Sequence, residues 1–221
     1  TRAALNILER ADRPFLLQIE AGRVDHAGHR NDAATLLHEQ LEFDDTLGDL
    51  LAYADERPDT LLIVTTDHGT GNPGLNGVGH RYTESTECFR RLADCRASYD
   101  RMYELLDSQR SGDVTEAHVR EIIGAHTGIE LRDREVQAIA RAMNGGEPCD
   151  LHNQHRNFIG ALSQSLGNAT GIGWTGTTHT NDLVPILAIG PGSERLAGCR
   201  HHTEVYDVLT ALGNLTKAAW R

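Results

Sequence analysis

The sequence has no apolar run long enough to cross a membrane and no surplus of positive charge. No stretch approaches the roughly 20 apolar residues that span a bilayer, so no membrane span is expected. The 221 residues include 21 Lys and Arg against 32 Asp and Glu, a formal net charge of −11. Binding nucleic acid through its phosphates needs a basic face, so the charge argues against such a partner. The acids are expected to serve solubility or metal binding.

Cysteine is scarce, and its spacing argues against two common motifs. The four cysteines are Cys88, Cys95, Cys149 and Cys199. None forms a C-x-x-C pair, so a structural zinc ribbon or a thioredoxin-like site is not expected. If Cys88 and Cys95 share one continuous helix, they lie roughly 10 Å apart, too far to bridge each other. Three disulfide connectivities and the redox compartment remain open.

Length and histidine content point to a globular, metal-binding chain. A chain of 221 residues can bury one sizeable core, or a core with a small appended unit. Twelve histidines, several beside aspartates, are a first indication of transition-metal chemistry. Residues 1–11 predict a polar helix rather than a signal peptide, so we expect the chain to begin within a fold.

The order of segments predicts an α/β fold, with a mostly parallel sheet sandwiched by helices. Strand, helix and strand joined by a crossover of this length imply parallel pairing, and ligands then bind at the carboxyl ends of the strands. The expected segments are a strand over 14–20 that ends at Glu20, a helix over 32–55, a buried strand over 60–66, a third strand over 183–189 and a helix over 203–212 capped by Thr203.

Helical patterns dominate the segment between the second and third strands. We therefore predict an α/β core formed by residues 1–82 and 172–221, with a helical insertion over residues 83–171. Such an insertion is expected to shape access or oligomer contacts rather than chemistry.

Candidate metal ligands follow or precede the predicted strands. Asp25 and His29 are four residues apart, so one helical turn or a tight loop points both to the same side. Asp67 and His68 come directly after the strand over 60–66, although Asp67 as a simple turn cap is an equal alternative. His179 precedes the third strand, and alone it would be a surface histidine. Together these His and Asp residues suit Zn²⁺ with an open position, whereas Glu20 suits Mg²⁺.

Three motifs in this order give a specific resemblance. They are residues 15–29 (FLLQIEAGRVDHAGH), residues 60–69 (TLLIVTTDHG), and His179-Thr180 followed by residues 189–192 (IGPG). They resemble the C-terminal half of alkaline phosphatases, and the similarity covers about residues 1–80 and 172–215. The helical segment would then occupy the place of the family's variable, crown-like region.

The resemblance implies roles for particular residues. Asp25, His29 and His179 would hold a first zinc ion, Asp67 and His68 a second, and Glu20 a magnesium ion. His26 would tune the phosphate pocket from behind the ligands, or else be merely solvated. The family's serine nucleophile, in an Asp-Ser-Ala context, has no counterpart among the serines of this chain. We therefore expect the nucleophile to lie upstream or in a separate polypeptide.

The predicted function is metal-dependent hydrolysis of phosphate monoesters. Two zinc ions would stabilise the entering and the leaving oxygen at phosphorus. The alternatives are a phosphodiesterase or nucleotide pyrophosphatase of the same superfamily, disfavoured by Glu20, and a non-catalytic metal-binding fragment. By itself the chain is expected to turn over little or nothing. The resemblance implies a periplasmic or extracellular location, and a homodimer is left open.

Overall fold

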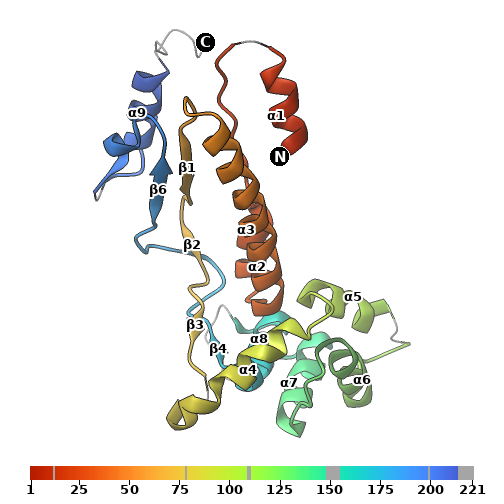
Figure 1. Ribbon diagram of the computed structural model, residues 1–221. Coiled ribbons are helices and arrows are strands. Elements are labelled where there is room, and N and C mark those ends of the chain that lie inside the picture. The colour runs from red at the N-terminus through yellow and green to blue at the C-terminus, as the bar shows by residue number, and fades with distance from the viewer. Residues whose placement is uncertain (12, 78, 109–110, 148–154, 199, 214–221) are drawn as a thin grey trace. The chain divides into compact units, whose positions relative to one another are not determined.

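The computed structural model describes residues 1–221 except 12, 78, 109–110, 148–154, 199 and 214–221 (Figure 1). The chain forms two compact units. One, here called the strand unit, comprises Thr1–Ile19, Glu42–Gly69 and Asn181–Arg221. The other, the helical unit, comprises Glu20–Leu41 and Thr70–Thr180. The long helix α3 (Ala33–Glu56) contributes residues to both, and it confirms the helix expected over 32–55.

The strand unit is built on one pair of short apolar strands. β1 (Leu62–Thr65) and β6 (Ile186–Ile189) pair with Leu62 opposite Ile189 and Thr65 opposite Ile186. β6 begins directly after Pro185, which has no backbone N–H to give to a ladder. These two strands confirm the apolar segments predicted over 60–66 and 183–189. The unit also contains α1 (Arg2–Glu9), the 3₁₀ helix η3 (Ser193–Leu196) and α9 (Glu204–Leu212).

Two expectations about the sheet were wrong. Residues 14–20 form no strand, and the β1–β6 pair is antiparallel. The rule for parallel pairing applies to strands joined by a single crossover. β1 and β6 are instead separated by more than a hundred residues, a connection that leaves the strand direction free. An apolar run such as 14–20 also needs a neighbouring strand before it can form a ladder.

The start of α9 differs from the predicted cap. Thr203 occupies the N-cap position, but its side chain makes no capping hydrogen bond to the helix. Its Oγ1 lies 2.8 Å from Nδ1 of His201 instead. The Glu204 carboxylate accepts from the His201 backbone N–H at 3.0 Å and so stabilises the chain just before the helix. Gly213 ends the helix, as predicted.

The helical unit places most of its residues in helices, around a large apolar core and a smaller cluster of Ala34, Leu92 and Ile172. After α2 (Gly22–His29) and the start of α3, its elements run in the order β2 (Gly69–Thr70), β3 (Gly74–Leu75), η1 (Gly79–Glu84), α4 (Ser85–Ala93), α5 (Tyr99–Ser108), α6 (Glu116–Thr127), α7 (Asp133–Met143), α8 (Phe158–Thr170), β4 (Ile172–Gly173) and β5 (His179–Thr180). β2 pairs with β5, and β3 pairs with β4 in antiparallel fashion. Helices α4–α8 thus fill most of residues 83–171.

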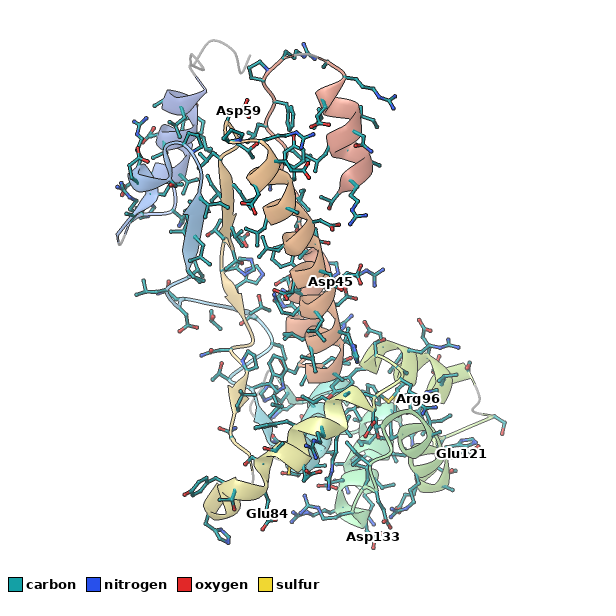
Figure 2. The ribbon with its side chains drawn as sticks, in the orientation of Figure 1. Asp45, Asp59, Glu84, Arg96, Glu121 and Asp133 are labelled. Carbon is teal, nitrogen blue, oxygen red and sulfur yellow. The ribbon has the colours of Figure 1, made fainter. Side chains whose placement is uncertain are left out.

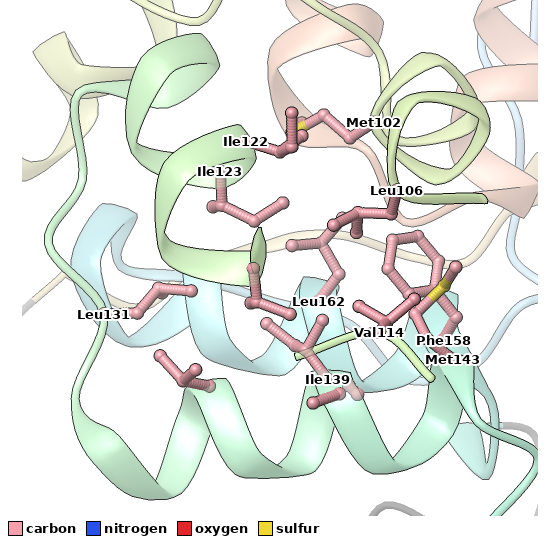
Figure 3. Packing of buried hydrophobic residues seen from close by; sticks show 14 of the residues in the cluster. Met102, Leu106, Val114, Ile122, Ile123, Leu131, Ile139, Met143, Phe158 and Leu162 are labelled. Carbon is pink, nitrogen blue, oxygen red and sulfur yellow. The ribbon is translucent and has the colours of Figure 1, made fainter. Parts of the chain in front are cut away.

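The core of the helical unit is formed by side chains from α5, α6, α7 and α8. Met102, Leu106, Ile123, Ile139 and Leu162 are at most 1% exposed and interdigitate between the helices (Figure 3). Charged side chains such as those of Glu121 and Asp133 lie on the outside of the same helices (Figure 2). This division of apolar and charged faces is what amphipathic helices need to pack together.

The helices of this unit begin and end at residues suited to those places. The Thr115 hydroxyl accepts from the His118 N–H at the start of α6, and Asn157 Oδ1 accepts from the Gly160 N–H at the start of α8. Gly128 and Gly171 end these helices in the left-handed conformation that glycine adopts without strain.

The cysteines that the structure describes are not bridged. Cys88 is buried in α4, and Cys95 lies just beyond the end of that helix; both are free thiols. Burial raises the pKa of Cys95 to about 11, with Asp32 and Asp94 adding to the effect. A thiol with so high a pKa is a poor nucleophile at neutral pH. Cys149 and Cys199 lie outside the described residues.

Glu135 in α7 provides a prediction about acid stability. Glu135 is 7% exposed. Its carboxylate accepts hydrogen bonds from the Arg132 side chain and, at 2.9 Å, from Asn168. Burial alone raises the pKa of Glu135, but these hydrogen bonds outweigh it and hold the pKa below its ordinary 4.5. A lowered folded-state pKa gives stability that is present above the unfolded value and lost as the pH falls through the folded one.

We therefore expect Glu135→Gln to lower the free energy of unfolding at pH 7 and to reduce the further loss between pH 5 and pH 3. Urea unfolding at several pH values measures both. Glu121→Gln, an exposed change on α6, serves as the control and should follow the unmodified protein. An acid loss unchanged by Glu135→Gln would contradict this account.

Candidate metal centre

Helix α2 carries two of the predicted ligands on one face. Asp25 and His29 are separated by one helical turn, and Asp25 Oδ2 lies 3.5 Å from His29 Nε2. Side chains at positions i and i+4 meet on the same side of a helix, so this geometry follows from the spacing alone. Of the two expected alternatives, a helical turn or a tight loop, the structure has the helical turn.

Thr70 holds the Asp25 carboxylate. Its Oγ1 donates to Asp25 Oδ1 at 2.6 Å. The contact depends on Gly28, because a Cβ at that position would lie 3.1 Å from the Thr70 side chain and 3.2 Å from its carbonyl oxygen. The glycine therefore lets α2 approach the strand β2 closely enough for this hydrogen bond to form.

Gly71 connects β2 to the segment that carries His179. Its N–H donates to the Thr178 carbonyl at 3.0 Å, and its own carbonyl accepts from the Thr175 N–H at 3.0 Å and from the Thr175 hydroxyl at 3.1 Å. Gly71 has φ +68°, a left-handed conformation that favours glycine. These bonds fix the backbone at Thr175 and at Thr178, the residue directly before His179.

The two imidazoles of this group face each other. His29 Nε2 and His179 Nε2 are 3.1 Å apart, and the ring centroids are 5.0 Å apart. His29 Nδ1 lies 2.7 Å from the Thr177 carbonyl oxygen. Because a carbonyl can only accept, Nδ1 must carry a proton, and in the neutral imidazole Nε2 then has a lone pair that faces His179. Ligand atoms of Asp25, His29 and His179 all lie within 4.8 Å of one another.

The remaining predicted site residues are not members of this group. Asp67 and His68 follow β1 in the strand unit, with Asp67 Oδ2 3.6 Å from His68 Nε2, and their approach to the first three ligands stays a prediction. Glu20 is exposed just before α2 and is not part of the Asp25 group. His26 is exposed on α2 beside Asp25, and its role also remains a prediction.

Sequence reasoning missed the residues that orient these ligands. The residues Gly69–Thr70–Gly71 follow the Asp67-His68 pair, and their composition favours a loop. A polar residue between two glycines is compatible with a close backbone approach, but the sequence does not reveal its partner. The Thr177 carbonyl left no signal in the sequence, since any residue has one.

Comparisons with known proteins agree on one family. The family model described as alkaline phosphatase matches residues 1–215, and so includes the helical residues 83–171 that the motifs did not cover. Alkaline phosphatase 3 of Bacillus subtilis is 27% identical over 207 residues, which cover 93% of this chain and 41% of that protein. Alkaline phosphatase 4 of the same organism is 22% identical over 212 residues, 95% of this chain and 41% of that protein.

A solved structure shows the same fold. The crystal structure of Thermus thermophilus alkaline phosphatase superposes with a TM-score of 0.80 and 32% identity, over 91% of this chain and 44% of that one. The chain thus spans less than half the length of the relatives that it matches. Among the described residues, no helix is both long and apolar enough to cross a membrane.

Proposed function

The chain belongs to the alkaline phosphatase family, and we propose that it supplies one complete set of zinc ligands, Asp25, His29 and His179, to a phosphomonoester hydrolase. The observation that carries this proposal is the convergence of two imidazole nitrogens and a carboxylate within 4.8 Å. One carboxylate and two histidines are ligands that Zn²⁺ accepts, and three protein ligands leave the fourth position open for a water or a phosphoryl oxygen.

The tautomer of His29 presents a nitrogen lone pair that can bind a cation. In the neutral imidazole, Nδ1 donates its proton to the Thr177 carbonyl oxygen, and Nε2 then carries the lone pair. Metal-bound histidines usually donate their second nitrogen to a carbonyl or a carboxylate in this way, which orients the ring and makes the ligand more basic. Thr70 does the same for the Asp25 carboxylate. Both ligands of α2 therefore have an orienting partner in the structure.

The assignment of the other two metal ions rests on the sequence motifs. Asp67 and His68 would hold a second zinc ion, and Glu20 a magnesium ion. Only Thr66 separates Asp67 from the end of β1, and the Asp67 side chain is 86% exposed, so it is accessible to an ion. Bound zinc would supply a Lewis acid for phosphoryl oxygens and a bound water of lowered pKa.

The chain's own residues would bind and orient in this reaction. Asp25, His29 and His179 would hold the ion, while Thr70 and the Thr177 carbonyl would keep two of them in place. The serine nucleophile is proposed to come from outside these 221 residues. The whole protein is proposed to hydrolyse phosphate monoesters in the periplasm or outside the cell.

Zinc titration of the chain tests this proposal. We expect the chain to bind Zn²⁺ at the Asp25 group, and His179→Ala to remove that binding. Anomalous scattering at the zinc edge would locate the ion. Failure of the unmodified chain to bind Zn²⁺ would contradict the proposal.

Activity assays separate the alternatives. With Zn²⁺ and Mg²⁺ added, the isolated chain is expected to hydrolyse neither a phosphate monoester nor a diester. Robust turnover of the monoester would contradict the external nucleophile, and turnover of the diester would favour a phosphodiesterase. For the complete protein, monoester hydrolysis that survives a chelator would contradict a metal mechanism.

The Thr70 hydroxyl provides a smaller prediction. Thr70→Val keeps the shape of the side chain but removes the donor to Asp25. Loss of a partner behind a metal ligand typically weakens metal binding about 10- to 100-fold. We expect a loss of about 10-fold in Zn²⁺ affinity, measured by competition with a chromophoric chelator. Thr70→Ser retains the hydroxyl and should stay close to the unmodified chain; equal losses in both variants would exclude the hydrogen bond as the cause.

A further inference from the structure

The three residues that follow the ligand His29 all bind elements of the helical segment. Arg30 Nε lies 3.0 Å from a carboxylate oxygen of Asp100 in α5. Asn31 Nδ2 lies 3.1 Å from Nε2 of His155, just before α8. The Asp32 carboxylate accepts from the Tyr99 N–H, at the start of α5, at 2.8 Å. The end of α2 is therefore held by contacts with residues 83–171, although none of the proposed ligands lies there.

Asp32 joins the ends of three helices. Its backbone N–H donates to the Ala27 carbonyl at 3.0 Å and closes the last turn of α2. Its Oδ1 accepts from the Thr35 N–H at 3.0 Å, which caps the start of α3. Its Oδ2 accepts from the Thr35 hydroxyl and from the Tyr99 N–H, each at 2.8 Å. One side chain thus stabilises the end of α2 and the beginnings of α3 and α5.

Burying a carboxylate at position 32 costs free energy, so the capping of α3 does not by itself explain why this residue is an aspartate. Asp32 is only 1% exposed, and this burial raises its pKa despite the three hydrogen bonds. A serine could cap α3 at less cost, because its hydroxyl is neutral. A single hydroxyl oxygen, however, could not receive donors from α3 and from α5 in the same geometry. The second carboxylate oxygen is what connects α5.

Asn31 belongs to the same group of contacts at the end of α2, which is here called the junction and comprises the contacts of Arg30, Asn31 and Asp32. It is fully buried and adopts φ +50°, an uncommon conformation for a residue other than glycine. Its Oδ1 lies 3.1 Å from the place that a Cβ on Gly71 would take. The residues after His29 therefore pack both against the helical segment and against Gly71, whose backbone is hydrogen-bonded to Thr175 and Thr178. A shift of α5 would reach His29 through this junction.

From this geometry we propose that Asp32 is a positioning residue for the metal centre, coupling the helical segment of residues 83–171 to Zn²⁺ affinity through the end of α2. The inference rests on the proposed zinc site. It differs from the expectation that this segment only shapes access or oligomer contacts.

Asp32→Asn tests the coupling in the full chain. The amide keeps the size of the side chain but replaces one acceptor oxygen by a donor, which repels an N–H or O–H donor. We expect about 10-fold weaker Zn²⁺ binding, the range observed when a partner behind a ligand is lost. The matched control is Val119→Ala, which removes two methyl groups from the core in α6, where Val119 is fully buried. It should lower stability but leave Zn²⁺ affinity within about twofold, since Val119 takes no part in the hydrogen bonds that connect Asp32 to α3 and α5.

Hydrogen exchange in the unmodified chain provides a test that does not depend on a variant folding. Coupling between two sites is reciprocal, so Zn²⁺ at His29 must strengthen the bond from the Tyr99 N–H to Asp32. We expect Zn²⁺ to slow exchange of the Tyr99 amide about 10-fold, matching the affinity effect, and to slow the Val119 amide less. In Asp32→Asn the additional protection of Tyr99 should disappear.

The outcomes separate the two proposals. If the unmodified chain binds no Zn²⁺, the proposed zinc site fails and this inference fails with it. If the chain binds Zn²⁺, but Asp32→Asn binds equally well or the Tyr99 amide is protected no more than Val119, only the coupling is overturned. Equal loss of affinity in Asp32→Asn and Val119→Ala would also overturn it, because general destabilisation would then suffice.

Discussion

His29→Ala is expected to abolish measurable Zn²⁺ binding at the Asp25 group, with a loss of affinity of more than about 100-fold. That bound follows because losing a partner behind a ligand already costs about 10- to 100-fold, and here the ligand itself is removed. The change also leaves Asp25 and His179 without the side chain that lies between them. His29 Nε2 is 3.5 Å from Asp25 Oδ2 and 3.1 Å from His179 Nε2.

His80→Ala is the matched control for this experiment. His80 is an exposed histidine of the same compact unit, in η1, so its loss removes one imidazole without touching the group. Competition with a chromophoric chelator measures the affinity, and circular dichroism checks that the helices persist. Zinc binding that His29→Ala and His80→Ala weaken equally would indicate scattered surface sites and would exclude the proposed centre. Acid should weaken binding too, because protons compete with the ion for the imidazole nitrogens.

Local spacing predicted the part of the site that a single helix builds. Asp25 and His29 are one turn apart, and a helix brings such residues together whatever surrounds it. His179 is 150 positions from His29, so no pattern within one segment links the two residues. Its assignment came from the order of the motifs rather than from periodicity. The structure then brought its imidazole next to that of His29.

The sequence could not reveal the contacts that orient the ligands. Thr70 and Asp32 are ordinary polar residues in the sequence, and their roles arise from hydrogen bonds to residues 45 and 67 positions away. Such bonds depend on how the elements pack, which no pattern within one segment records. The burial of Asp32 is unexpected for a charged residue, and only its partners explain it.

The strand predicted over 14–20 does not form, and it illustrates a prediction that local composition made wrongly. Its apolar composition predicted burial, yet Phe15 is 40% and Leu16 is 65% exposed. An apolar run indicates that a segment favours burial, but it does not supply the neighbour that would bury it. The composition of β1 and β6 likewise could not predict their antiparallel pairing, because the path of the long connection between them sets the strand direction.

Gly71→Ala is expected to weaken Zn²⁺ binding by about 100-fold or more, although residue 71 supplies no ligand. A Cβ at this position would lie 2.8 Å from the Trp174 ring, 2.9 Å from the Gly28 carbonyl oxygen and 3.1 Å from Asn31 Oδ1. The left-handed conformation itself costs an alanine about 1–2 kcal/mol. Relieving both must move the backbone that binds Thr175 and Thr178, and with it the two sides of the site.

Gly79→Ala is the control that separates backbone strain from the close contacts around residue 71. Gly79 has φ +63°, nearly that of Gly71, but a Cβ there would meet nothing within 4 Å. It should therefore cost only the backbone strain of about 1–2 kcal/mol in unfolding free energy and leave Zn²⁺ affinity unchanged. Thermal unfolding and chelator competition on both variants separate strain from displacement. If the two variants lost stability and affinity alike, the close packing of β2 against α2 would have no part in placing His179 opposite His29.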